Sequence, residues 1–229
     1  MEQHRGLLLI GLLCGLFLAA DTERLEQKLR STNTDERRDA AKALAGMGDE
    51  ASGAAKALTK ALSDKDRFVR RFAAQALGAI GPSVAGSATE PLARILNQFG
   101  ETKEVQEAAA VSLGKMGLKG RDPLIAALQS RRLDPSVRQK AAESLGNLGA
   151  DGASAVPALV QALDDPGTRG AAVGALGQIG PAARGAEKEL RGMLENKQFR
   201  RDKALKDAVQ SALKKISTKQ TTQTSKKDS

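Results

Sequence analysis

A short pattern of small and apolar positions recurs along most of the chain. Each copy has small apolar residues three and four positions before a marker leucine, and Met, Ile or Leu three positions after it. This spacing follows the turn of an α-helix and does not alternate as a strand would. The copies read AAKALAGMG (40–48), AAQALGAIG (73–81), AAVSLGKMG (109–117), AAESLGNLG (141–149), AVGALGQIG (172–180) and, without glycines, VQSALKKIS (209–217).

A second pattern lies between these copies. Pairs of leucines four residues apart begin 11 to 15 residues after a marker leucine, and this spacing places both leucines on one face of a helix. The marker leucines are Leu44, Leu77, Leu113, Leu145, Leu176 and Leu213; the pairs are Leu58/Leu62, Leu92/Leu96, Leu124/Leu128, Leu159/Leu163 and Leu190/Leu194. Each unit is therefore predicted to be a helix, a turn and a second helix.

The repetition predicts the fold class. Units of this size bury their apolar faces by stacking on one another, and terminal units act as caps. We expect an all-α protein, an α-solenoid of about five helix pairs. Leu25 and Leu29 indicate a half-repeat cap at the start, and residues 203–216 indicate another at the end.

Glycine and proline predict the helix boundaries. A glycine four residues past each of the first five markers should end the first helix in a left-handed C-cap. Glycines one residue past four markers lie inside the first helix, where each costs about 1 kcal/mol relative to Ala; they predict close packing against a neighbouring unit. The C-cap set is Gly48, Gly81, Gly117, Gly149 and Gly180, and the interior set is Gly78, Gly114, Gly146 and Gly177. Pro91, Pro123 and Pro157 are predicted near the start of second helices.

These units resemble short HEAT-like repeats of the phycobilin-lyase type over about residues 31–217. The resemblance implies a concave surface lined by the second helices, and a ladder in which Asp residues of inter-repeat turns pair with Arg residues of first helices. The candidate ladder residues are Asp66 and Arg70, Asp134 and Arg138, and Asp165 and Arg169. Units one and three carry Asn33/Arg37 and Thr102/Gln106 instead, so an interruption is expected there. Recurrence at one repeat position favours a structural role over an active site or anion clamp.

The first twenty residues form a separate segment. A short leading region with Arg5 is followed by an apolar run over 6–20, which is shorter than the roughly 20 residues that span a bilayer. We interpret residues 1–20 as a cleavable signal peptide, with an uncleaved anchor or a buried N-terminal helix as alternatives. The repeat array is then 21–217, followed by a disordered basic polar tail at 218–229, and the protein is expected to be periplasmic or secreted.

Residue usage narrows the chemistry. His4 is the only His and Cys14 the only Cys, so a chain cleaved after residue 20 has neither. It cannot carry a zinc site of His or Cys ligands, a cysteine nucleophile or a Ser–His–Asp triad. We predict no catalytic residues, metal, cofactor or small-molecule substrate. A phycobilin-lyase-like enzyme is kept as a remote alternative.

Charge provides the remaining indication of a partner. The formal net charge is +9, and residues 197–229 hold ten Lys and Arg against three Asp. The candidate basic patch is Arg200, Arg201, Lys203, Lys206, Lys214 and Lys215. It could bind an anionic membrane, a nucleic acid or an acidic protein surface, or it could be a solvated cap with no partner.

The leading expectation is a non-catalytic scaffold or adaptor that binds a protein partner on its concave surface. The candidate contacts are polar residues flanking the leucine pairs: Lys56, Lys60, Arg94, Gln161, Lys188 and Arg191. The chain has no Trp or Tyr, the usual anchors of tight interfaces, so moderate affinity is expected.

Overall fold

The protein is an α-solenoid of five stacked helix pairs with a single helix at each end. The computed structural model describes residues 20–196, 199 and 202–218, and this part of the chain contains helices, turns and bends but no strand. The α-helices are α2 (Thr34–Met47), α3 (Ala55–Ala61), α4 (Arg67–Ile80), α5 (Ala85–Leu96), α6 (Lys103–Lys115), α7 (Leu118–Gln129), α8 (Pro135–Gly146), α9 (Val156–Ala162), α10 (Arg169–Ile179), α11 (Glu187–Glu195) and α12 (Lys203–Ser217). The 3₁₀ segments are η1 (Gly48–Ala54), η2 (Gly81–Val84), η3 (Gly149–Ala155) and η4 (Gly180–Ala186).

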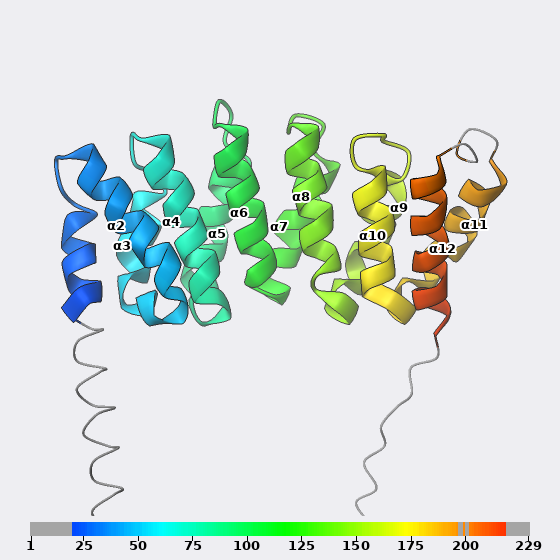
Figure 1. Cartoon of the computed structure of the whole chain (residues 1–229), viewed down its shortest axis with the longest axis horizontal. Helices are drawn as coiled ribbons and strands as arrows, with labels where there is room; N and C mark the ends of the chain where they lie inside the picture. Colours follow the sequence, from blue (N-terminus) through cyan, green and yellow to red (C-terminus); the bar gives the residue numbers. More distant parts are fainter. Residues whose placement is uncertain (1–19, 197–198, 200–201, 219–229) are drawn as a thin grey trace, which may run out of the picture.

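The helices form two rows. Figure 1 shows the first helices, α2, α4, α6, α8 and α10, side by side in one row, and the second helices, α3, α5, α7, α9 and α11, in a row behind them. Residues 20–28 are helical and precede the first pair, while α12 closes the stack. The predicted fold class, number of pairs and half-repeat caps are confirmed.

The first helices begin and end where the local chemistry requires. The side chains of Asn33, Asp66 and Asp134 accept hydrogen bonds from backbone N–H groups in the first turns of α2, α4 and α8, which satisfies donors that have no partner inside the helix. All five predicted C-cap glycines have positive φ.

The detailed C-cap prediction is wrong in one respect. At Gly48, Gly81, Gly117 and Gly180 the ψ angles lie between −134° and −148°, far from the left-handed helical region. The conformation is instead close to the first central position of a type II′ turn, which glycine adopts without strain. It turns the chain sharply into the second helix.

Two of the three proline predictions are also wrong. Pro91 and Pro123 lie inside α5 and α7, whereas Pro157 lies in the first turn of α9 as expected. The second helices of units two and three begin several residues earlier than the proline positions suggested, because the turn after the glycine is short or runs directly into the helix.

The core is one continuous layer of leucine and alanine between the two rows. The first five marker leucines and the first leucine of every pair in units one to five are fully buried. Leu213, the sixth marker, is only half-buried; Val209, Ala212 and Ile216 are the buried residues of α12. The reason is that no further unit within the described residues packs against the outer side of α12.

The interior glycines permit the first helices to touch. A Cβ at Gly78 would lie 2.7 Å from Cβ of Ser112, and one at Gly114 would lie 2.8 Å from Cβ of Ser144. At Gly177 the distance to Cα of Ala212 would be 3.0 Å. The predicted close packing is confirmed. In α12 the matching position is Lys214, which is exposed because the stack ends there.

Several predictions concern residues outside the described ranges. These are the leader up to residue 19, the tail from residue 219, and Arg200 and Arg201 of the basic patch. None of the helices in the described residues has the length and apolar character needed to cross a bilayer.

Candidate partner-binding grooves

A ladder of ion pairs joins neighbouring units beneath the inter-repeat turns. Nε of Arg37 lies 2.7 Å from Asp64, and Nε of Arg70 lies 2.6 Å from Glu101. Further along the stack, Nη2 of Arg138 lies 2.6 Å from Asp165. In each case an arginine near the start of a first helix binds a carboxylate of the following inter-repeat turn.

The ladder differs in detail from the one expected. Asp66 does not pair with Arg70: its carboxylate binds Arg38 of the preceding unit, at 2.6 and 2.9 Å. Arg70 binds a Glu where an Asp was expected. The predicted interruption at unit one is wrong, since Arg37 is paired with Asp64.

The ladder does change in unit three. Gln106 replaces the arginine, and its Nε2 donates to the backbone oxygen of Gln98 instead of to an acid. Asp134, which lies in the next turn, caps α8 through the backbone N–H of Ser136. At the end of the ladder, Arg169 donates to the backbone oxygen of Leu163 and lies over the ring of Phe199.

Two grooves occupy equivalent places in the repeat, each against a ladder pair: the N-terminal groove lies between the helix at residues 20–28 and α3, and the C-terminal groove lies between α7 and α9. The N-terminal groove has a volume of about 1390 Å³ and is lined by Glu26, Leu29, Arg30, Thr32, Thr34, Asp35, Arg37, Arg38, Lys56, Ala57, Lys60, Ala61, Ser63, Asp64, Lys65 and Asp66. The C-terminal groove has a volume of about 680 Å³ and is lined by Leu128, Gln129, Arg131, Arg138, Ala158, Gln161, Ala162, Asp164, Asp165 and Thr168. Aligning the leucine pairs places Lys60 and Gln161 at the same repeat position.

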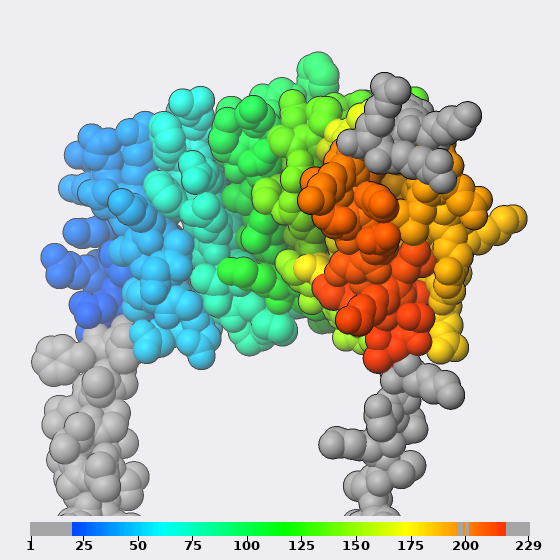
Figure 2. Space-filling model, turned by 45° about the vertical axis from the view of Figure 1, so that its right-hand side comes forward, coloured from blue at the N-terminus to red at the C-terminus, as the bar shows by residue number. Residues whose placement is uncertain are grey.

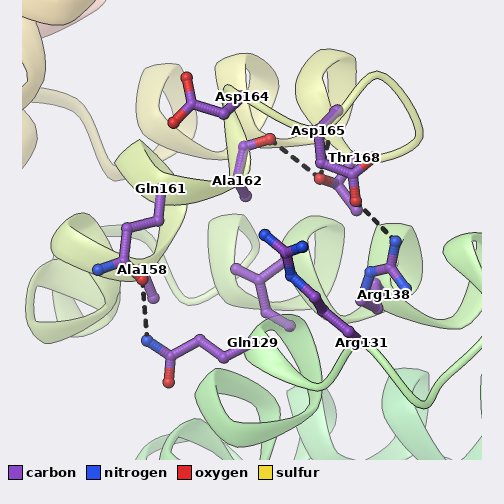
Figure 3. Close-up of a pocket in the computed structure, with 10 residues that line it drawn as sticks. Gln129, Arg131, Arg138, Ala158, Gln161, Ala162, Asp164, Asp165 and Thr168 are labelled. Atoms are coloured by element: carbon purple, nitrogen blue, oxygen red, sulfur yellow. Dashed lines mark hydrogen bonds and ion pairs between the residues drawn. The ribbon is translucent and has the colours of Figure 1, made fainter.

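The C-terminal groove is a hydrogen-bonded frame around Arg131, which has no ion-pair partner among the described residues. Figure 3 shows Arg131 pointing into the groove between Gln161 and Arg138. Nε2 of Gln129 donates to Oε1 of Gln161 across the groove at 3.3 Å, and the Thr168 hydroxyl donates to the backbone oxygen of Ala162 at 3.0 Å. Because Gln129, Gln161 and Thr168 are held by partners, Arg131 is a cationic group of the groove that can reach a ligand.

The electrostatics of the ladder lower the pKa of two of its carboxylates, Asp66 and Asp165. Hydrogen bonds from Arg38 lower the pKa of Asp66 to about 2, with smaller contributions from the backbone N–H groups of Val69 and Phe68. The backbone N–H of Gly167, followed by Arg138, also lowers the pKa of Asp165. These acids are occupied as hydrogen-bond acceptors, so proton transfer near neutral pH is not available to them.

The predicted contact residues divide into two sets. Lys56 and Lys60 line the N-terminal groove and Gln161 lines the C-terminal one. Arg94, Lys188 and Arg191 are exposed on second helices but line neither groove. Arg94 is paired with Glu90, and Arg191 with Glu187, within their own helices.

Sequence reasoning missed Lys65 and Arg131, which also line the grooves. Both lie in the turns that follow a leucine pair, a segment that we treated as a connection. Lys65 lies between two ladder acids, and Arg131 lies three residues after a paired leucine. These positions could have identified them, because the turns that follow the leucine pairs lie beside the grooves.

The interior glycines place close contacts between units on the row of first helices, and the concave surface of second helices stays a prediction. The close glycine contacts join α4 to α6, α6 to α8 and α10 to α12, all of them first helices or the cap that continues their row. The grooves lie on the other side of the stack, against the row of second helices.

The basic patch is only partly within the described residues. Lys203, Lys206, Lys214 and Lys215 are all exposed on α12. Figure 2 shows this helix at the end of the stack, with its outer surface uncovered by any other helix of the described part. Within the same residues, no group of three or more His, Cys, Asp or Glu side chains is arranged to hold a metal ion.

Comparisons with known proteins agree with this architecture. A family model for HEAT repeats matches residues 22–99, 89–176 and 121–214. No curated protein sequence matches the chain.

Solved structures share the fold. An engineered protein is 25% identical with a TM-score of 0.61, and the match covers 86% of this chain and 96% of that one. The CpcE–CpcF complex of phycocyanin lyase from Nostoc sp. PCC7120 is 25% identical with a TM-score of 0.57, covering 85% and 76%. Kap121p bound to Nup53p is 18% identical with a TM-score of 0.66; the match covers 88% of this chain but 23% of Kap121p, and shows the fold alone.

Proposed function

Because the chain belongs to the HEAT-repeat family, we propose that it is a non-catalytic scaffold or adaptor that binds a protein partner in the grooves between its second helices. The observation that carries the proposal is the pair of grooves at one repeat position. Their walls are fixed by ladder ion pairs and packed leucines, and they are lined by cationic side chains that have no carboxylate partner among the described residues. A preformed surface of this kind binds without a large ordering cost.

The solved relatives support protein binding as the class of function. Kap121p is seen with Nup53p, and also with the extreme C-terminus of the phosphatase Cdc14p. Affinity for a partner should be moderate, because neither groove is lined by an aromatic side chain.

Site-specific photocrosslinking tests the proposal. A photoreactive residue at position 60 or 161 lies in a groove, whereas one at Lys42 lies on the opposite row, on the exposed side of α2. We expect a discrete, saturable crosslinked product from positions 60 or 161 in the native host, and none from position 42. Equal labelling from all three positions, or from none, would contradict the proposal.

We also propose that residues 1–20 direct export, so that the array acts in the periplasm or outside the cell. N-terminal sequencing of the protein from fractionated cells tests this. A mature chain starting near residue 21 in the exported fraction would support it, and a full-length chain in the cytoplasmic fraction would refute it.

The first alternative is electrostatic binding of an anionic membrane or nucleic acid through α12 and the residues after it. The four exposed lysines of α12 favour it. It requires an affinity that falls steeply with salt and disappears when the segment from residue 197 is deleted. Binding that is insensitive to salt would exclude it.

A lyase-like activity is the second alternative, favoured by the similarity to the CpcE–CpcF complex. It requires the chain to bind a bilin. An unchanged bilin absorption spectrum in the presence of the protein would exclude it.

A further inference from the structure

The N-terminal groove carries an excess of unpaired positive charge. Each of its four carboxylates is already bound to an arginine of the groove. The pairs are Glu26 with Arg30, Asp35 and Asp66 with Arg38, and Asp64 with Arg37. Three lysines, Lys56, Lys60 and Lys65, also line the groove, and none has a carboxylate within 4.0 Å in the described residues.

These lysines are not required by the repeat. Lys56 and Lys60 are four residues apart on one face of α3, and Lys65 is in the turn that follows. In the C-terminal groove the corresponding positions are Pro157, Gln161 and Pro166, although the ladder pair behind them is the same. Since a repeat stacks equally well without the three cations, packing does not explain their presence in the first unit.

We infer that the N-terminal groove binds an acidic peptide segment of the partner, with Lys56, Lys60 and Lys65 contacting its carboxylates. This inference rests on the proposed function and assigns the chemistry of one of the two grooves. The ladder acids cannot neutralise the lysines because arginines occupy them, so the lysines remain available for a ligand.

The shape of the groove favours an extended peptide. Its volume of about 1390 Å³ exceeds the range of about 300–1,000 Å³ typical of small-molecule sites. The hydroxyl groups of Thr32, Thr34 and Ser63 line the same space and can hydrogen-bond a peptide backbone. A recessed groove between helices also gives little contact with a flat bilayer.

A nucleic acid fits the groove less well. Binding of single strands depends on aromatic side chains for base stacking, and no Phe is among the described residues that line the groove.

Fluorescence anisotropy with a labelled peptide of alternating Glu and Ala tests the inference on the full chain. The groove variant is Lys56→Gln/Lys60→Gln/Lys65→Gln. The matched control is Lys188→Gln/Lys203→Gln/Lys206→Gln, which removes the same charge from exposed positions elsewhere, Lys188 being the counterpart of Lys56 in α11. We expect the groove variant to weaken binding about tenfold or more, and the control about twofold or less. All six lysines are exposed, so the far-ultraviolet circular dichroism of both variants should match the parent.

Three outcomes would overturn the inference. The first is that the acidic peptide does not bind, and the second is that the two variants weaken its binding equally. The third is that a single-stranded oligonucleotide or anionic vesicles bind more tightly than the peptide and that the groove variant abolishes this binding. A partner crosslinked from position 60 despite no affinity for the acidic peptide would overturn this inference while leaving the proposed function intact. Peptide binding with no crosslinked partner would support the groove chemistry and count against the scaffold role.

Discussion

The contact between α4 and α6 at Gly78 permits a sharp test of the stacking. Substitution by Ala would place a Cβ 2.7 Å from Cβ and 2.9 Å from Cα of Ser112, against the 3.5–4.0 Å at which carbon atoms normally pack. The two helices would have to separate by close to an ångström. The Ser112 hydroxyl also donates to the backbone oxygen of Ala74 at 2.7 Å, and this buried bond joins the same helices.

The net effect follows from three magnitudes. Ala gains about 1 kcal/mol over Gly in a helix interior. Overpacking of a filled site costs about 1–3 kcal/mol, and leaving the Ser112 hydroxyl or its acceptor unpaired costs about 1–3 kcal/mol more. We therefore expect Gly78→Ala to lower the free energy of unfolding by about 1–5 kcal/mol.

The matched control is Gly174→Ala. Gly174 lies inside α10, is exposed, and has no atom within 4 Å of an added Cβ. This variant should gain stability by up to about 1 kcal/mol, because the helix propensity acts alone. Urea unfolding followed by circular dichroism compares the two substitutions in one protein. If Gly78→Ala proved as stable as Gly174→Ala, the interior glycines would not be explained by close packing.

Three further predictions concern the ladder and the surface. Arg70→Ala removes one partner of an ion pair whose Glu101 side chain is fully buried, and should lower the free energy of unfolding in urea by about 3 kcal/mol. The control Arg94→Ala breaks an exposed ion pair and should change the free energy of unfolding by less than about 1 kcal/mol. Equal losses in the two variants would contradict this prediction. The pKa of Asp66 is lowered to about 2, below its unfolded value, so its contribution of up to about 2 kcal/mol is present above about pH 4 and is lost as the pH falls towards 2. Asp66→Asn should therefore flatten that part of a stability-against-pH curve, and an unchanged curve would refute the assignment. Phe99 is fully exposed, so Phe99→Ser should leave the urea midpoint within about 0.5 kcal/mol of the parent; a larger loss would show that the ring is buried in solution.

Local sequence signals accounted for most of the fold and failed at particular points. The marker leucines and interior glycines were placed correctly, because helical periodicity and the absence of a Cβ act within one helix and its immediate neighbour. Pro91 and Pro123 were misplaced because a helix can begin well before a proline when the preceding turn is short. Leu213 keeps the repeat pattern but is only half-buried, because no unit within the described residues packs over it.

The candidate site was harder to predict. Lys56, Lys60 and Gln161 were named as exposed residues of second helices, but the sequence could not show that a groove lay beside them. Lys65 and Arg131 were missed, since turns of neighbouring units come together only after stacking.

The amino-acid sequence alone determined an array of stacked helix pairs, its capped ends and its buried leucine layer. Those features depend on periodic apolar positions and on residues with special backbone freedom, which act over a few turns of chain. The tertiary structure decided that Asp66 forms its ion pair with Arg38 rather than Arg37, and that Arg70 forms its ion pair with Glu101. It also decided that the grooves open on the side of the stack away from the glycine contacts. These outcomes depend on the distance and rotation between units about thirty residues apart in the sequence. A shift of one unit against the next by the length of a side chain is enough to give an arginine a different carboxylate partner.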